Sequence, residues 1–323
     1  MGATVARTAV ADALARLARD AAHTGYGAAA DSACRGCTHG PEVLADRPDG
    51  IVVRHGDTVA KAHDGNADPV ALRARIAVAA DARLAGILLP PLPPPPEVRE
   101  VLGHPVSLWP HGVPVDPADP DAAPWEETAT LLARLHTVPA GSLPGPPPPA
   151  RGPAKAARAV ARMRRDIRRP ATWDVIRAWH RLPDWARDEA PPPAPTGLCH
   201  GDLHLGQLVR GPAPDGPWLL IDIDDLGIGD RAWDLGRPAA WFAAGLLAPE
   251  VWERFIGAYA AAGGPAADPA DPWARLDVPA RALTVQTAAL ALLRAAREER
   301  EPDETDTAVL DACARIARLS PEL

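Results

Sequence analysis

LCHGDLHLGQLV, residues 198–209, is the stretch that decides the fold of this chain. It holds two histidines, an aspartate and a glutamine within a few positions, with glycines at 201 and 206 and apolar residues at both ends. Asp and Gly are common in polar turns. The stretch therefore fits either a polar turn between buried strands or a loop that carries chemistry, and the segments around it decide between the two.

The segment that follows, residues 207–223, predicts a β-hairpin, because two apolar strands flank the turn GPAPDGP. A hairpin returns the chain to where it began, so Gln207, Asp222 and the preceding Asp202 are expected at one end of the ribbon. An amide oxygen and a carboxylate suit Mg²⁺, and a further carboxylate can accept a proton from a hydroxyl. Such a set fits phosphoryl transfer, where positioning and charge neutralisation do most of the catalysis. From the residues alone, the polar-turn interpretation stays open.

The upstream segment IVVRHGDTVAKAH, residues 51–63, predicts a second hairpin around its central glycine. In its second strand Val59, Lys61 and His63 share one face, while small apolar residues share the other. A lysine in such a strand indicates a specific role. Asp68 and the proline after it are the N-cap and first-turn residues of a helix expected to run to about residue 80.

The remainder of the chain predicts one more strand and then mainly helices. The strand, HPVSLWPHGVPV at 104–115, ends in a connection rich in proline and glycine. The predicted helices are 123–138, 154–168, 171–188, 238–262, 279–298 and one near the C-terminus, with 207–223 as the one β interruption. The layout is a small sheet-containing N-terminal part followed by a large helical part.

Composition limits the classes of function. The chain has 323 residues, of which 47% are hydrophobic, which is typical of a globular protein. A net charge of −8 and a pI near 5.7 argue against nucleic acid as the main partner. No window approaches eighteen consecutive apolar residues, which argues against a membrane span. The first 25 residues predict an amphipathic helix rather than a signal peptide, so we expect a cytoplasmic protein.

The four cysteines give no disulfide framework in a chain of this length. Cys34, Cys37 and His39, in the segment CRGCTH, could offer metal ligands. A structural zinc site would need a second ligand pair at suitable spacing, and the other two cysteines are isolated. We therefore expect a surface turn at this segment.

HGDLHLGQ at 200–207, followed by LIDIDDLGIGDRAWDLG at 220–236, resembles the signature pair of the aminoglycoside phosphotransferase family. LLARLHTV at 131–138 also resembles the helix that precedes the catalytic loop in that family. The resemblance implies an α+β fold of the protein-kinase-like, two-lobed type. Its small N-terminal lobe, with an antiparallel sheet and the nucleotide site, would be residues 1–112. Its larger, mainly helical lobe, with the catalytic and acceptor sites, would be residues 113–323.

The resemblance also implies roles for single residues. Asp202 would be the catalytic aspartate that orients the substrate hydroxyl. Asp222 and Gln207, which stands where the family has asparagine, would bind Mg²⁺. Lys61 would contact the α- and β-phosphates of ATP or GTP. Backbone groups near three hinge residues would hold the adenine: Trp109, His111 and Gly112.

Five further residues of the two motifs are assigned supporting roles. His200 would be a scaffold residue of the loop, Asp230 a helix cap and Asp234 a brace for the loop. Asp224 and His204 are additional candidates for the site, and the role of His204 is unexplained.

The sequence departs from the family pattern at the partner of Lys61. Family members pair this lysine with a glutamate of the following helix, and the segment PVALRARIAVAADARL contains none. Asp81, Asp68 or Glu42 could substitute, or Lys61 could act alone. The chain also lacks a glycine-rich phosphate loop, which favours a small-molecule kinase over a protein kinase.

The function expected from this resemblance is an ATP- or GTP-dependent phosphotransferase. Its acceptor would be a hydroxyl of a small polar molecule, most directly an antibiotic and alternatively a sugar or other metabolite. Two other interpretations stay open: a pseudokinase that binds nucleotide without catalysis, and a metal-dependent hydrolase built on the same aspartates with His204. We expect the nucleotide and the acceptor as partners, no nucleic acid or membrane, and a monomer or homodimer.

Overall fold

The computed structural model describes residues 2–23, 35–47, 49–92, 98–211 and 215–319. The chain packs as two compact units. Unit 1 comprises Met1–Ala122, Gly141–Pro148 and Gly206–Asp224, and unit 2 comprises Ala123–Ala140, Pro149–Leu205 and Asp225–Leu323. The 207–223 hairpin therefore packs with the N-terminal residues. The functional boundary expected after residue 112 stays a prediction.

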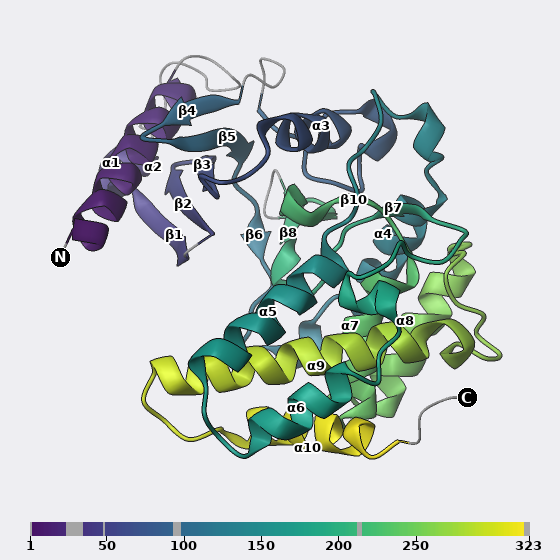
Figure 1. Ribbon diagram of the computed structural model, residues 1–323. Helices are drawn as coiled ribbons and strands as arrows, with labels where there is room; N and C mark the ends of the chain where they lie inside the picture. Colours follow the sequence, from purple (N-terminus) through teal and green to yellow (C-terminus); the bar gives the residue numbers. More distant parts are fainter. Residues whose placement is uncertain (1, 24–34, 48, 93–97, 212–214, 320–323) are drawn as a thin grey trace. The chain divides into compact units, whose positions relative to one another are not determined.

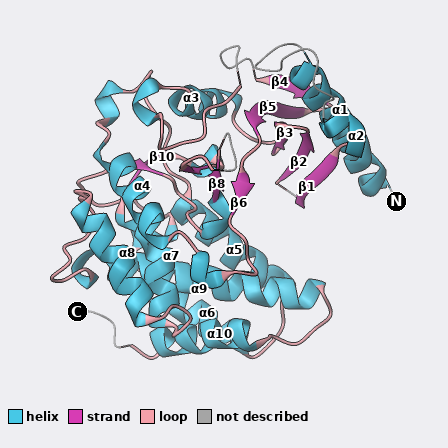
Figure 2. Cartoon of the chain, turned by 180° about the vertical axis from the view of Figure 1, so that it is seen from behind, coloured by secondary structure: helices cyan, strands magenta, loops and turns pink. Residues whose placement is uncertain are grey.

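Unit 1 is built on an antiparallel sheet of five strands in the order β1-β2-β3-β5-β4 (Figures 1 and 2). The strands are β1 (Glu42–Arg47), β2 (Gly50–His55), β3 (Thr58–His63), β4 (Arg99–Val101) and β5 (His104–Pro110). The hairpin predicted at 51–63 is confirmed as β2 and β3. The helix predicted after it is α3 (Pro69–Ala79), and the Asp68 carboxylate accepts a hydrogen bond from the Val70 N–H at 2.8 Å.

Helix α1 (Gly2–His23) covers one face of this sheet, as Figure 1 shows. The shared core consists of Val10, Leu14 and Ala18 from the helix and Ile51, Val53, Ala60, Ala62 and Val106 from the strands. Burying a leucine fully, as at Leu14, contributes about 1.5–3 kcal/mol. Because side chains alternate along a strand, Lys61 and His63 lie on the sheet face away from α1.

A second, three-stranded sheet in unit 1 has the order β6-β8-β9. Its strands are β6 (Val113–Pro114), β8 (Leu208–Arg210) and β9 (Trp218–Leu220), so the hairpin predicted at 207–223 is confirmed. The Leu220 N–H donates to the Ile87 carbonyl at 2.8 Å, and the Leu89 N–H donates to the Leu220 carbonyl at 2.9 Å. These bonds tie β9 to the segment that follows α3. The α+β class is confirmed.

Unit 2 is mainly helical. Its elements are α4 (Trp125–Thr137), α5 (Gly152–Asp166), α6 (Ala171–Trp179), β7 (Gly197–Cys199), β10 (Gly227–Gly229), α7 (Ala232–Ala243), α8 (Pro249–Ala261), α9 (Trp273–Arg297) and α10 (Glu304–Ala317). Helix α9 packs against α5, α6, α7 and α10 (Figure 1). It is long and apolar enough to cross a membrane by length and composition, but 72% of its apolar window is buried inside the protein. It is therefore the core helix of this unit.

The helix predicted over 238–262 is wrong, because two helices, α7 and α8, cover this region. The break follows from Gly245, whose backbone is left-handed with φ of 77°, and from Pro249, which begins α8. The helix predicted over 171–188 is also too long. It ends at Trp179, and Pro183 precedes a separate 3₁₀ turn, Asp184–Arg187.

Two features escaped the sequence pattern. β7, just before the first motif, and β10, within the second, form a short antiparallel pair, where only the 207–223 hairpin was expected. Three-residue strands are too short to show alternation.

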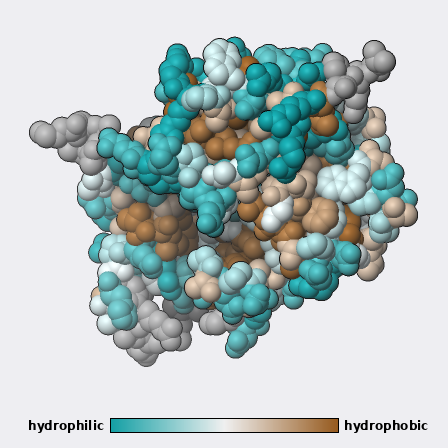
Figure 3. Space-filling model, turned by 90° about the horizontal axis from the view of Figure 1, so that it is seen from below, coloured by the Kyte–Doolittle hydropathy of each residue, from teal (hydrophilic) through white to brown (hydrophobic). Residues whose placement is uncertain are grey.

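The CRGCTH segment is a short helix, α2 (Arg35–His39), rather than a turn, and Cys34 lies outside the described residues. On the face that Figure 3 shows, apolar patches lie among hydrophilic residues, as on ordinary protein surfaces.

Candidate active site

The loop between β7 and the hairpin turns sharply at Gly201. Its φ is 88°, in the left-handed region that favours glycine, and a Cβ there would lie 2.3 Å from the backbone oxygen of Asp225. The loop therefore passes in direct contact with the Asp225 backbone. A glycine at this position is required both by the backbone angle and by the close approach.

Asp234, in the first turn of α7, holds this loop. Its buried carboxylate accepts the backbone N–H of His200 at 2.6 Å and of Gly201 at 2.8 Å. The His136 ring contacts the same carboxylate at 3.0 Å, and its other nitrogen contacts the hydroxyl of Tyr259 at 2.8 Å. Asp234 thus holds the backbone at residues 200 and 201, and the His200 side chain is fully buried.

Asp230, assigned as a helix cap, lies at the start of α7. Its carboxylate accepts the Ala232 N–H at 3.1 Å and an Arg275 N–H at 3.0 Å. The carboxylate therefore satisfies a backbone donor that the first turn of a helix leaves unpaired.

Asp202 lies between two cations within unit 2. Lys155 Nζ donates to its Oδ2 at 2.7 Å, and the Arg237 guanidinium donates to its Oδ1 at 2.9 Å. Burial alone would raise the pKa of Asp202, but the charges of Lys155 and Arg237 outweigh burial and hold the pKa below its ordinary value. Asp202 is therefore an ionised hydrogen-bond acceptor with both oxygens fixed.

Lys155, on α5, also donates to Asp225 Oδ2 at 2.7 Å, so one ammonium group bridges two carboxylates. Burial opposes its charge, but Asp225 and Asp202 outweigh burial and raise the pKa of Lys155. Sequence reasoning did not select Lys155, Arg237 or Asp225. One signal could have found the lysine: the chain has two lysines among 34 basic residues, and the other is Lys61. Lysine and arginine are not interchangeable at paired sites.

His204, two residues after Asp202, is half-buried. Burial is the main cause that lowers its pKa to about 4, and the Arg237 charge adds to this effect while Asp202 opposes it. The ring is therefore neutral near pH 7, and it can serve as a hydrogen-bonding group but not as a cation.

In unit 1, Lys61 pairs with two aspartates that follow β9. Its Nζ lies 2.7 Å from Asp222 Oδ1 and 3.0 Å from Asp224 Oδ2. Burial disfavours the charge on Lys61, but the two carboxylates outweigh burial and raise its pKa. The three residues proposed as partners are engaged elsewhere: Asp68 caps α3, Asp81 accepts the Arg83 N–H, and Glu42 lies 3.6 Å from Arg54.

His63 was not selected from the sequence, although its face of β3 was predicted correctly. Its Nδ1 lies 2.7 Å from Asp224 Oδ1, and its Nε2 lies 2.7 Å from Ser107 Oγ. Trp109 Nε1 donates to the same serine at 2.8 Å. A chain of hydrogen bonds thus runs from the predicted hinge to Asp224. Burial opposes the charge of Asp224, but Lys61 and then His63 outweigh it and lower the pKa of this carboxyl.

Gln207 begins the hairpin and Asp222 follows its second strand, so the two residues are neighbours. The Gln207 amide nitrogen lies 3.3 Å from Asp222 Oδ2. Asp222 has φ of 64°, which an aspartate tolerates better than most residues. A half-turn of the amide would present its oxygen instead of its nitrogen. With Asp224 beside them, the donor set consists of hard oxygens, and these residues therefore fit Mg²⁺.

The predicted hinge lies at the end of β5. The His111 N–H donates to the Asp57 carbonyl at 2.8 Å, so this group is already used within the protein. A Cβ on Gly112 would lie 2.5 Å from the Val209 side chain, which explains the glycine. Of the three hinge residues expected to hold adenine, His111 therefore has its backbone N–H already engaged.

Solved structures with the same fold include several small-molecule kinases. A choline/ethanolamine kinase family protein from Mesorhizobium loti is 16% identical, with a TM-score of 0.59 over 99% of this chain and 96% of that chain. A thermostable mutant of aminoglycoside phosphotransferase APH(4)-Ia is 12% identical, with a TM-score of 0.55 over 88% and 98%. Plasmodium vivax ethanolamine kinase is 12% identical, with a TM-score of 0.52 over 86% and 82%. At such identities the likeness shows the fold, which is kinase-like.

These structures place the fold in the kinase-like class, and the proteins named in them are small-molecule kinases. The sequence model of the phosphotransferase enzyme family, APH, matches residues 47–277. No curated protein matches the chain significantly. The chain belongs to the APH phosphotransferase family, and this confirms the resemblance noted in its two motifs.

Proposed function

We propose that this enzyme transfers the γ-phosphoryl group of ATP or GTP to a hydroxyl of a small polar acceptor. The observation that carries the proposal is Asp202, an ionised carboxylate fixed by Lys155 and Arg237 on a loop that Asp234 braces. A fixed acceptor of this kind orients an incoming hydroxyl, and orientation is the main contribution of the protein in phosphoryl transfer.

The transfer would proceed as follows. The acceptor hydroxyl donates its hydrogen to Asp202, and its oxygen forms a bond to the γ-phosphorus while the bond to the β-phosphate oxygen breaks. The nucleoside diphosphate leaves with that bond's electron pair, and the hydroxyl proton passes through Asp202 to solvent. The low pKa of Asp202 favours late proton transfer, which suits a loose transition state with little charge on the attacking oxygen.

The cluster around Lys61 would bind the donor. Asp222, Gln207 and Asp224 would hold Mg²⁺, which when bound neutralises charge on the β- and γ-phosphates. Lys61 would break its ion pair with either Asp222 or Asp224 and contact phosphate oxygens instead. One structure of the similar aminoglycoside phosphotransferase is described as a ternary complex with AMP-PNP and hygromycin B, which supports a nucleotide donor here.

For the acceptor we propose an antibiotic first and a sugar, amino alcohol or other metabolite second, in the cytoplasm. Macrolide and aminoglycoside phosphotransferases and choline/ethanolamine kinases all appear among the similar structures. The net charge of −8 is compatible with a cationic acceptor.

The test is a coupled ADP- and GDP-release screen against aminoglycosides, macrolides, nucleoside and peptide antibiotics, free sugars, choline and ethanolamine. We expect acceptor-dependent release, with mass spectrometry of the acceptor showing one added phosphate. The Asp202→Asn variant should bind Mg²⁺-nucleotide as wild type does but lose about 10²–10⁴-fold in kcat. Asp222→Ala should lose metal-dependent nucleotide binding itself.

Three outcomes would contradict the proposal. Equal turnover by Asp202→Asn would remove that residue from catalysis. Full Mg²⁺-nucleotide affinity and turnover in Asp222→Ala would remove the metal assignment. Nucleotide binding in a thermal-shift titration, with no transfer to any acceptor of the panel, would favour a non-catalytic pseudokinase.

A further inference from the structure

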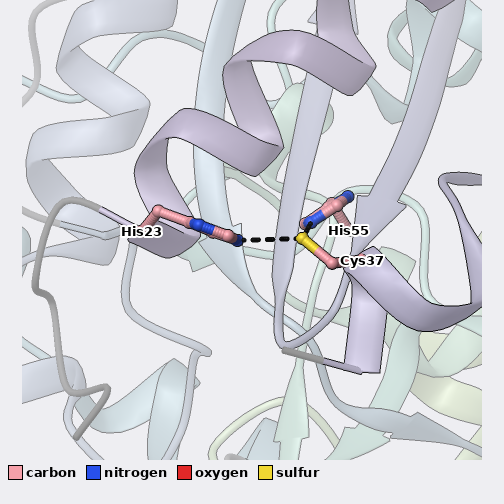
Figure 4. Close-up of side chains that lie close together, drawn as sticks. All are labelled: His23, Cys37 and His55. Atoms are coloured by element: carbon pink, nitrogen blue, oxygen red, sulfur yellow. Dashed lines mark hydrogen bonds between the residues drawn. The ribbon is translucent and has the colours of Figure 1, made fainter. Parts of the chain in front are cut away.

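Three side chains that no catalytic role uses converge within unit 1, as Figure 4 shows. They are His23 at the end of α1, Cys37 on α2 and His55 at the end of β2. Cys37 Sγ lies 3.3 Å from His23 Nε2 and 3.6 Å from His55 Nε2. All three donor atoms lie within 4.8 Å of one another.

These distances match a tetrahedral metal centre. With Zn–S near 2.3 Å and Zn–N near 2.0–2.1 Å, sulfur and nitrogen ligands of one zinc ion lie about 3.5 Å apart. The two observed sulfur–nitrogen distances bracket that value. Two nitrogen ligands would lie about 3.3 Å apart, and rotation of the exposed His23 side chain can bring its nitrogen to this distance.

The chemistry of the three groups is also suitable. Metal ligation requires neutral imidazoles and a thiolate. Cys37 and His55 line a cavity of about 280 Å³ together with Arg16 and Arg19. The two arginines place positive charge in the same cavity as the sulfur, and the cavity leaves room for an anion or water at a fourth position.

A hydrogen-bond network is the competing explanation. A thiol has one proton, so Cys37 can donate to one of the two imidazole nitrogens, and the second ring must then donate an N–H to the sulfur. Such a network needs neither a metal nor a thiolate. The experiment must therefore detect a sulfur–metal bond and not merely the proximity of the groups.

We propose that His23, Cys37 and His55 form a Zn²⁺ site that fastens α1 and α2 to the end of β2. The ligands come from three separate elements, so the ion can stabilise their packing only in the folded chain. This site could not be predicted from the sequence, because the spacing of its ligands is not typical of zinc motifs. His23 lies 14 residues before Cys37, and His55 lies 18 residues after it.

The test uses the full chain without a histidine tag, stripped with a chelator and titrated with Co²⁺ and then Zn²⁺. Wild type should bind one Co²⁺ with a thiolate-to-metal charge-transfer band, and Zn²⁺ should displace that band and raise Tm. Cys37→Ser should lose the band and weaken Zn²⁺ affinity by more than about 100-fold, since losing even a supporting partner of a ligand costs about 10–100-fold. His23→Gln should weaken the affinity in the same direction.

Two matched variants separate this site from others. His39→Ala changes an exposed histidine of the same short helix, and Asp222→Asn changes the predicted magnesium site. Both should keep the cobalt band. The proposal is overturned if wild type shows no such band, if Cys37→Ser keeps it, or if Asp222→Asn removes it. Circular dichroism of metal-free Cys37→Ser, which should match metal-free wild type, excludes misfolding as the cause.

Discussion

Replacing Gly201 by alanine should destabilise the loop that carries Asp202 by more than the backbone angle of residue 201 alone accounts for. A left-handed residue with a Cβ costs about 1–2 kcal/mol. The new Cβ would also lie 2.3 Å from the backbone oxygen of Asp225, which cannot rotate away as a side chain could. Moving packed backbone costs a further 1–3 kcal/mol or so. We therefore expect Gly201→Ala to lower the free energy of unfolding by about 2–5 kcal/mol.

Gly245 provides the matched control in the same unit. Its φ is 77°, and a Cβ there would meet nothing within 4 Å. Gly245→Ala should therefore cost about 1–2 kcal/mol for the backbone angle and nothing for a clash. Urea unfolding followed by tryptophan fluorescence gives both free energies. Because Asp202 follows Gly201 directly, Gly201→Ala should also lower kcat, while Gly245→Ala should leave kcat unchanged.

The reasoning is refuted if Gly201→Ala is no more destabilised than Gly245→Ala. That result would mean that the loop can move away from Asp225 freely. A loss of kcat with unchanged stability would instead show that the contact positions Asp202 without contributing to the free energy of unfolding.

Three further predictions concern residues on and around the loop that carries Asp202. Lys155→Met leaves two carboxylates without their shared cation, so it should destabilise the fold by about 3–5 kcal/mol. It should also raise the pKa of Asp202, which would shift the acid limb of the pH profile of kcat/KM upward. An acid limb at the same pH as in wild type would contradict this prediction. The pKa of His204 is lowered to about 4 from 6.5, so the stability that depends on its neutral ring is complete above pH 6.5 and is lost as the pH falls towards 4, by about 3 kcal/mol. The free energy of unfolding of His204→Gln should therefore depend less on pH in this range than that of wild type. The same pH dependence in both proteins would show that His204 does not cause it. Asp234→Asn exchanges one carboxylate oxygen for an NH₂ group, which cannot accept a hydrogen bond, so one of the two loop N–H groups loses its acceptor. The change should cost about 1–3 kcal/mol in urea unfolding and lower kcat more than it changes KM.

Local patterns were sufficient for the elements that carry the predicted site. The hairpins of Lys61 and Asp222 follow from alternation and turn residues that lie close together in the sequence. The face of β3 that carries Lys61 could be predicted, because side chains alternate along a strand. The helix over 238–262 was misjudged because its composition stays helical while Gly245 ends the helix through its backbone angle.

The supporting charges could not be predicted from local pattern. Lys155 lies 47 residues before Asp202 and 70 before Asp225, on a helix whose other basic residues indicate a solvated face. His63 lies 161 residues from its partner Asp224. Pairings at such separations depend on the tertiary fold, and one sequence without relatives to compare carries no record of them.

The scarcity of lysine has a practical consequence. Lys61 and Lys155 are the two side-chain amines of the whole chain, and each is held between two carboxylates. Amine-selective reagents therefore have two side-chain targets plus the α-amine, and both targets lie where nucleotide and acceptor are expected. Acylation needs a neutral amine, and the carboxylates raise the pKa of both lysines, so both should react slowly in the folded chain. Mass spectrometry after acylation, with and without ligand, would read any change in rate at each position separately. The two lysines thus offer one reporter for the predicted nucleotide site and another for the predicted acceptor site.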